Sequence, residues 1–277
     1  PPRHTCRPEP ASQATPGAST LLVGLLDKSG TLGMIRICLG LFPQASQWAT
    51  PFVLVLAVIS VLWGATMAVT SKDLMRLVSY TSVSHFGFMI IGIFAVTTTS
   101  LTGSIFYMFN HGFSTAALFL VLGFLVKRRG SAQVDAFGGV QKTAPVLAGM
   151  FLFAGLATMS LPGISNFIGE FMVLAGAWSR HPVYVAVATL GMVLGAVYIL
   201  LTYKRTMTGP LTQATKAHVT TDLTGLEKAA LTPLVILLLV FGFFPRPMLH
   251  VIEPVAHQTM SIVGVTDPAP AAEEGVK

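Results

Sequence analysis

Four side chains that can bind protons stand inside long apolar stretches of the sequence: Lys28, His85, His111 and Glu170. An ionisable group that faces lipid costs several kcal/mol, so we expect all four to face the protein interior. Histidine titrates near neutral pH, and a buried lysine or carboxyl group can be tuned toward that range. Because the four residues lie on four separate stretches, packing of those stretches would join them into a chain of proton-binding sites.

Hydroxyl groups precede the first histidine and could hold bridging water beside it. The group comprises Ser79, Tyr80, Thr81, Ser82 and Ser84. A purely structural role is the alternative for both histidines. His85 would then be a neutral imidazole bonded to Ser82 or Ser84, and His111, which follows Asn110, would be a hydrogen-bonded core residue.

Two further charges share the first apolar stretch with Lys28. Asp27 is its sequence neighbour, and adjacent residues point in different directions on a helix, so the two do not simply neutralise each other. Arg36 lies about two turns further on and is expected to extend to the outer membrane boundary.

The two cysteines, Cys6 and Cys38, are too few for a disulfide framework. His4 and Cys6 form a weak metal motif that we interpret as part of an unstructured terminus, so no metal site is predicted. Cys38 is expected to be a small packed residue.

Composition assigns the class of protein. Hydrophobic residues make up 53% of the 277 residues and charged residues only 10%, with a mean hydropathy of +0.71. Soluble domains carry about 25% charged residues, so the chain is expected to be an integral membrane protein whose surroundings are lipid. The net charge of +6 then indicates basic cytoplasmic loops and no nucleic-acid partner.

Seven apolar segments are long enough to cross a bilayer. They are roughly 18–41, 50–70, 77–97, 102–126, 144–178, 183–203 and 229–250. Basic residues gather in the loops after the second, fourth and sixth segments, which puts residue 1 on the cytoplasmic side and the C-terminus outside. We expect a transmembrane domain over 17–250, between a disordered segment 1–16 and an outer-side tail 251–277 that ends in TDPAPAAEEGVK.

The fifth segment, 144–178, is too long for one straight span. It would measure about 52 Å against a hydrocarbon core of roughly 30 Å. Pro162, Gly163 and Gly169 in SLPGISNFIGEF predict a break near 162–169. A broken membrane helix is tolerated only inside protein or along a wet cavity, and Glu170 directly after the break is typical of transporters.

Three stretches carry a resemblance to a known family: DLMRLVSYTSVSHFGFMIIGIF, FNHGFSTAALFLVLGFL and LPGISNFIGEFMVLAGAW. They resemble the antiporter-like proton-pumping subunits of respiratory complex I, NADH–quinone oxidoreductase. The similarity is greatest to M-type subunits, counterparts of mitochondrial subunit 4, over about residues 11–250. It implies an all-α membrane fold of about seven transmembrane helices, the fifth one broken. These would correspond to the family's second half, one five-helix repeat plus two flanking helices.

The same resemblance implies roles for the four titratable residues. Lys28 in GLLDK matches the family's central-axis lysine. His85 in SVSHFGF and His111 in NHGFSTAALF match histidines on that axis. Glu170 in NFIGEF matches the carboxylate at the end of the relay, where L-type and N-type subunits usually have lysine. The family's first repeat is not represented, which is typical of a truncated, frameshifted or split product.

We therefore expect a proton-translocating, multi-pass subunit of NADH–quinone oxidoreductase in the inner (plasma) membrane, contributing the second half-channel and the central relay. No cofactor is expected in this chain. NADH, FMN, iron–sulfur clusters and quinone would bind partner subunits, and the neighbours would be L-type, N-type and small K-type membrane subunits. Two alternatives stay open: a subunit of a multisubunit cation/proton antiporter, and a truncated remnant with only a scaffold role.

Overall fold

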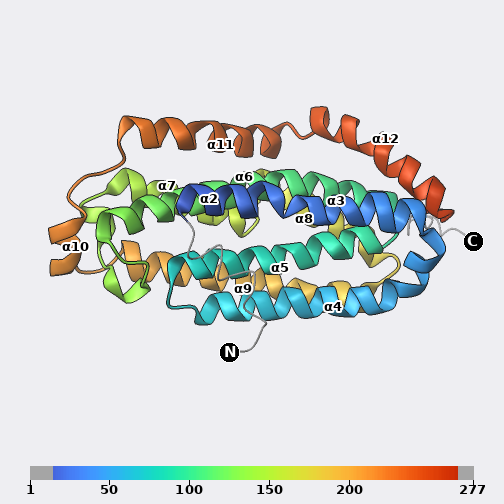
Figure 1. Ribbon diagram of the computed structural model, residues 1–277, viewed down its shortest axis with the longest axis horizontal. Helices are drawn as coiled ribbons and strands as arrows, with labels where there is room; N and C mark the ends of the chain where they lie inside the picture. The colour runs from blue at the N-terminus through green and yellow to red at the C-terminus, as the bar shows by residue number, and fades with distance from the viewer. Residues whose placement is uncertain (1–14, 268–277) are drawn as a thin grey trace, which may run out of the picture.

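The computed structural model describes residues 15–267 of the chain, and this part is a bundle of helices joined by turns. Figure 1 shows the longest helices running side by side, with α11 and α12 along one edge and α4 along the opposite edge. In chain order the elements are α2 (Pro16–Leu21), the π-helical η2 (Leu22–Leu26), α3 (Lys28–Gly33), the π-helical η3 (Met34–Leu39), α4 (Pro43–Thr70), α5 (Leu74–Phe94), α6 (Thr98–Arg129), the 3₁₀ turns η4 (Val134–Ala136) and η5 (Val140–Lys142), α7 (Pro145–Thr158), α8 (Ser165–Trp178), α9 (Pro182–Met207), α10 (Gln213–His218), α11 (Gly225–Phe243) and α12 (Arg246–Val263).

Five of these helices are long and apolar enough to cross a membrane: α4, α5, α6, α9 and α11. Large apolar side chains such as Trp48, Val183 and Phe243 stand exposed on α4, α9 and α11, as expected of a surface that meets lipid. By contrast, α5 and α6 are mostly covered by their neighbours. The prediction of an all-α membrane protein is confirmed, and the two histidine-bearing helices occupy its interior.

The first predicted segment, 18–41, is helical without being a uniform α-helix. α2 passes into η2 and α3 passes into η3, with Asp27 as a turn residue between the two halves. π-Helical turns are rare and occur frequently at functional sites. Here they flank Lys28, the first residue of α3.

The fifth predicted segment is broken over residues 159–164, which overlap the predicted region 162–169 in part. α7 ends at Thr158 and α8 begins at Ser165. Within the break, Ser160 and Gly163 adopt positive φ values of 57° and 94°, which a helix cannot contain, and Pro162 has no backbone N–H to continue one. Gly169, which was expected in the break, lies inside α8 instead.

The seventh predicted segment, 229–250, and the predicted tail 251–277 need correction. α11 ends at Phe243, and after Pro245 a separate helix, α12, runs from Arg246 to Val263. Ile252, Ala256 and Met260, four residues apart, are buried on one face of α12, which packs mainly against α6. The polar residues between them lower the mean hydropathy of this amphipathic helix, so a search for continuous apolar spans does not detect it.

The predicted disordered ends fall mostly outside the described residues. Residues 1–14, with His4 and Cys6, and residues 268–277 are not described. Pro16 begins α2, so the last residue of the predicted segment 1–16 is helical.

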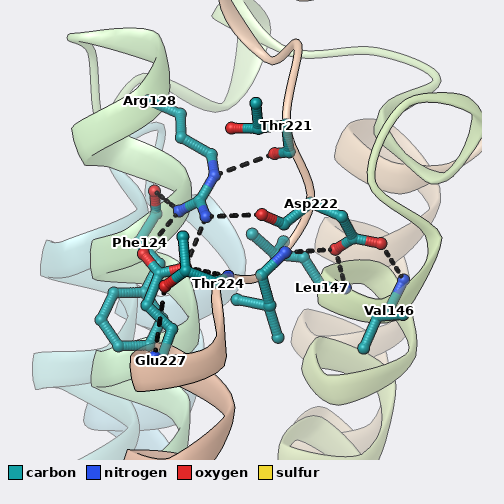
Figure 2. Close-up of polar contacts among 9 residues, drawn as sticks. Phe124, Arg128, Val146, Leu147, Thr221, Asp222, Thr224 and Glu227 are labelled. Carbon is teal, nitrogen blue, oxygen red and sulfur yellow. Dashed lines mark hydrogen bonds and ion pairs between the residues drawn. The ribbon is translucent and has the colours of Figure 1, made fainter.

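An ion pair fastens the loop before α11 to the end of α6 (Figure 2). Arg128 donates to the two carboxylate oxygens of Glu227 at 2.9 Å and 2.5 Å, and the paired side chains are only 10% and 14% exposed. The same guanidinium donates to the carbonyl oxygens of Thr221 and Asp222, each at 3.0 Å. Arg128 therefore holds both the loop and the first turn of α11.

Asp222 carries this connection on to α7. Its carboxylate accepts from the backbone N–H groups of Val146 at 2.8 Å and Leu147 at 2.9 Å, in the first turn of that helix (Figure 2). A carboxylate at a helix N-terminus satisfies N–H groups that have no partner within the helix. One short loop thus ties together the ends of α6, α7 and α11.

Replacing Arg128 with alanine should lower the free energy of unfolding by about 2–4 kcal/mol, because it leaves the Glu227 carboxylate largely buried and unpaired. Chemical unfolding in detergent micelles measures the change. Lys127→Ala removes the same charge from an exposed neighbour on α6 and should change the value by less than about 0.5 kcal/mol. An equal loss in the two variants would show that the ion pair contributes nothing specific.

Candidate functional site

Two of the four predicted residues, Lys28 and His111, contact each other inside the bundle. The Nζ atom of Lys28 lies 2.9 Å from Nδ1 of His111 and donates to the carbonyl oxygen of Val23, also at 2.9 Å. It also stands 5.0 Å from the centre of the Phe86 ring, on its face. His111 is fully buried, and its Nε2 atom lies 3.1 Å from the hydroxyl of Thr115. The lysine head group is thus held by a carbonyl, an imidazole and an aromatic ring.

The second histidine, His85, lies beside His111, so that Lys28, His111 and His85 form a line of titratable side chains. The ring centres of His85 and His111 are 5.2 Å apart. Each ring nitrogen of His85 has a tyrosine partner: Nδ1 lies 2.5 Å from the Tyr107 hydroxyl, and Nε2 lies 3.4 Å from the Tyr198 hydroxyl. These partners differ from Ser82 and Ser84, which the alternative of a purely structural His85 named.

Glu170, on α8, is the last titratable residue of the line. The Tyr107 hydroxyl donates to Oε2 of Glu170 at 3.3 Å, and the Ser160 hydroxyl makes a short hydrogen bond to the same oxygen. Tyr107 therefore bridges His85 and Glu170. A consistent donor order exists in which His85 donates from Nδ1 to Tyr107, and Tyr107 donates to an ionised Glu170.

The predicted supporting residues lie away from this line. Ser82 donates to the carbonyl of Val78 in its own helix, and Ser84 donates to the carbonyl of Val61 across to α4. Tyr80 packs edge-to-face against Trp63. Hydroxyls in membrane helices often bond backbone carbonyls in this way, because no bulk water is present to accept from them.

Asn110 and the break residues also support the site only indirectly. The Asn110 amide donates to the Phe106 carbonyl, and among the described residues its Oδ1 atom has no hydrogen-bond partner although it is buried. Pro162 and Gly163 are exposed and shape the break. Asn166 on α8 donates to Ser114 on α6 and cross-links the two helices near His111.

Four hydroxyl-bearing residues that contact the titratable groups were not predicted, namely Tyr107, Thr115, Ser160 and Tyr198. Phe86, whose ring faces Lys28, was not predicted either. Tyr107 lies four residues before His111, so it shares a face of α6 with a predicted site residue, and this spacing is the signal that would have found it. Nothing in the local sequence marks Ser160 or Tyr198, which reach the site from the break and from α9.

Two pairs of close backbone contacts set these distances. A Cβ atom on Gly112 would lie 2.8 Å from the carbonyl oxygen of Gly24, so only glycine lets η2 approach α6 beside Lys28 and His111. A Cβ atom on Gly169 would lie 2.7 Å from Cβ of Tyr107, which brings α8 against α6 next to Glu170. The polar line therefore depends on small residues adjacent to it.

Other charged and sulfur-bearing residues take no part in the line. Arg36 is exposed on η3, and Cys38 is a half-buried free thiol. Among residues 15–267, no three histidine, cysteine, aspartate or glutamate side chains are grouped as metal ligands would be. The buried polar groups that do meet can exchange protons through short contacts, and this is the chemistry the arrangement supports.

The chain has relatives among proteins of known sequence. Residues 4–195 match the model of a family described as NADH:quinone oxidoreductase/Mrp antiporter, transmembrane. NADH-quinone oxidoreductase subunit M of Mycobacterium tuberculosis is 47% identical over 275 residues, which are 99% of this chain and 49% of that protein. The chain thus spans about half the length of the curated relatives that it matches.

Solved structures share the fold. A chain of respiratory complex I from Thermus thermophilus with bound NADH superposes with a TM-score of 0.86 at 31% identity, covering 95% of this chain and 55% of that one. A chain of the Mrp complex from Dietzia sp. superposes with a TM-score of 0.83 at 19% identity, covering 94% of this chain and 57% of the other. The second likeness shows the fold alone.

The Gly169→Ala substitution should push Tyr107 away from Glu170 and lower the free energy of unfolding by about 1–3 kcal/mol, because the added methyl group has no room between α8 and α6. Gly149→Ala on α7 is the matched control. Its added methyl meets no atom within 4 Å, so it should leave stability unchanged or raise it by up to about 1 kcal/mol. Unfolding in detergent measures both, and a neutral Gly169 variant would contradict the tight contact.

Proposed function

We propose that this chain, which belongs to the NADH:quinone oxidoreductase/Mrp antiporter transmembrane family, is a proton-translocating membrane subunit of NADH–quinone oxidoreductase. Its part would be the second half-channel together with the central relay of Lys28, His111, His85 and Glu170. The single observation that carries this proposal is the chain of contacts among those four side chains, with Tyr107 as its bridge.

The contacts suggest how a proton would move. The Lys28 ammonium group gives a proton to His111 across 2.9 Å. Transfer to His85 needs a ring reorientation or one bridging water, because the ring centres are 5.2 Å apart. His85 then donates from Nδ1 to the Tyr107 oxygen as Tyr107 gives its own proton to Glu170, so the tyrosine ends unchanged.

The broken helix suits the last step. Ser160, in the break, bonds the carboxylate of Glu170, and the backbone around it is held by turns and not by a continuous helix. Irregular backbone at membrane depth is typical of sites where an ion or proton leaves or enters a transporter. A small movement of the break would detach Ser160 and open Glu170 to water beyond the bundle.

The setting of the subunit follows from the same assignment. Partner subunits would carry NADH, FMN, the iron–sulfur clusters and quinone, and this chain would hold no redox cofactor. Its neighbours would be L-type, N-type and K-type membrane subunits in the plasma membrane. The basic residues at the ends of α5, α6 and α9 and in the adjoining turn would face the cytoplasm: Lys72, Arg76, Lys127 to Arg129, Lys204 and Arg205.

A cation/proton antiporter subunit is the second candidate, because the Mrp chain from Dietzia sp. has the same fold. The higher identity to subunits named for NADH–quinone oxidoreductase favours the first candidate. Proton flux that requires Na⁺ or K⁺ in proteoliposomes would favour the second. A complex that pumps normally with the relay residues neutralised would instead leave only a scaffold role.

Glu170→Gln should lower proton pumping and coupled quinone reduction roughly tenfold or more, since the amide keeps the shape of the side chain but cannot take up a proton. A pH-sensitive dye inside proteoliposomes that contain the complete complex reports pumping. Glu253→Gln, on the exposed side of α12, should pump as the unmodified complex does. Near-normal pumping by the Glu170 variant would reject the relay.

Tyr107→Phe tests the bridge between His85 and Glu170. The ring still fills the core, but the hydroxyl that contacts both groups is lost, so pumping should fall about as far as in the Glu170 variant. Tyr198→Phe removes a longer contact that lies beside the line and should have a smaller effect. Equal effects of the two variants would mean that Tyr107 is not the bridge.

A further inference from the structure

A small, partly open cavity lies between the first helix and α5, and its lining includes Asp27, the sequence neighbour of Lys28. About 10 Å³ of it is open to the centre of a water molecule, which is room for about one water. Its polar lining comes from Asp27, Ser79 and Ser82. Val23 and Phe86 also line it, and these are two of the residues that contact the Lys28 head group.

The lining can hold a water molecule by hydrogen bonds. Ser79 and Ser82 donate their hydroxyl protons to the carbonyls of Met75 and Val78, so their oxygens stay available as acceptors. The Asp27 carboxylate adds a third polar group. A buried water needs two to four polar partners, and this cavity supplies three.

A larger cavity follows on the same helix and opens at the end of the bundle. It has a volume of about 340 Å³ and lies at the turn between α4 and α5, lined by Lys72, Arg76, Tyr80 and neighbouring residues. Ser79 lines the inner cavity and its neighbour Tyr80 lines the outer one. Along α5, Arg76, Ser79 and Val83 are spaced three or four residues apart, so they form one stripe that runs from the outer cavity to the inner one.

We propose that Asp27 and one water held by Ser79 and Ser82 reload Lys28 with protons drawn from the outer cavity. This inference rests on the proposed function, in which Lys28 gives its proton to His111. The water passes one proton to the neutral amine of Lys28 and receives one from the Asp27 carboxyl group, so the water is regenerated. Asp27 then takes up a proton from water in the outer cavity. The line would thus have an uptake side on α5 that is separate from the Glu170 end.

The structure of Lys28 suits this role. Adjacent residues on a helix point in different directions, and the turn at Asp27 separates the π-helical η2 from α3. Lys28 therefore reaches back to Val23 and His111, while Asp27 lines the cavity on the side of α5. The Lys28 head group thus contacts His111 of the relay, while the side chain of its sequence neighbour lines the cavity.

Asp27→Asn in the complete complex should lower proton pumping and coupled quinone reduction roughly tenfold or more. Asp27→Glu keeps a carboxyl group and should recover most of the activity. Wild-type pumping by the Asn variant would overturn the proposal. If Glu170→Gln is impaired while Asp27→Asn is not, the uptake route is wrong and the relay stands. If neither is impaired, the relay itself fails.

Val83→Ile tests the water without touching a polar group, because its extra methyl group fills the cavity that Val83 lines. Pumping should fall several-fold, and a cryo-EM map of the complex that resolves ordered water should show density in the cavity of the unmodified protein and none in the variant. Val55→Ile adds the same methyl group to a side chain of α4 that is 45% exposed and should change neither. An unmodified cavity without water, or a variant that pumps normally, would contradict the proposal.

Discussion

The constraint on which this structure depends is the high free energy of an unpaired polar group in an interior enclosed by lipid. Each titratable group of the line has specific partners that offset this free energy. Lys28 has a carbonyl, an imidazole and an aromatic face, and Glu170 has two hydroxyl donors. Because the imidazole and hydroxyl partners are themselves polar, each brings the next polar group close. The result is a line of polar groups in which only the step between the two histidines, with ring centres 5.2 Å apart, lacks a direct hydrogen bond.

Close packing makes that line short enough to be useful. Glycine occurs where two helices cross beside a site residue: Gly24 with Gly112 near Lys28, and Gly169 with Tyr107 near Glu170. A single added methyl group at Gly112 or Gly169 would force the backbones apart. Since protein hydrogen bonds span about 2.5–3.2 Å, any further separation of α6 and α8 would weaken the Tyr107–Glu170 bond, which is already 3.3 Å long. The close packing of the helices therefore sets the distances between the polar groups of the site.

Regular buried helices and irregular backbone occupy different parts of the bundle. α5 and α6 are buried by their neighbours and hold both histidines and Tyr107, whereas α4, α9 and α11 present apolar side chains outward. Irregular backbone is confined to the π-helical turns around Lys28 and to the break beside Ser160. Both lie next to proton-binding groups at the two ends of the line. The loop tied by Arg128 and Asp222 secures α7, which leads into the break.

Composition and the spacing of apolar segments were enough to predict an all-α membrane protein, because lipid permits few ways to satisfy a backbone. The same cost of burial singled out Lys28, His85, His111 and Glu170 as interior residues. The four-residue spacing from His111 was the only sequence signal for Tyr107, and Tyr198 could not be predicted, since it reaches His85 from α9, 113 residues further along the chain. α12 was not predicted as a separate helix, because its apolar residues recur on one face and do not form a continuous apolar span. Only tertiary packing decides which of several nearby hydroxyls a buried imidazole meets, because that choice is set by distances between helices and local sequence does not encode them.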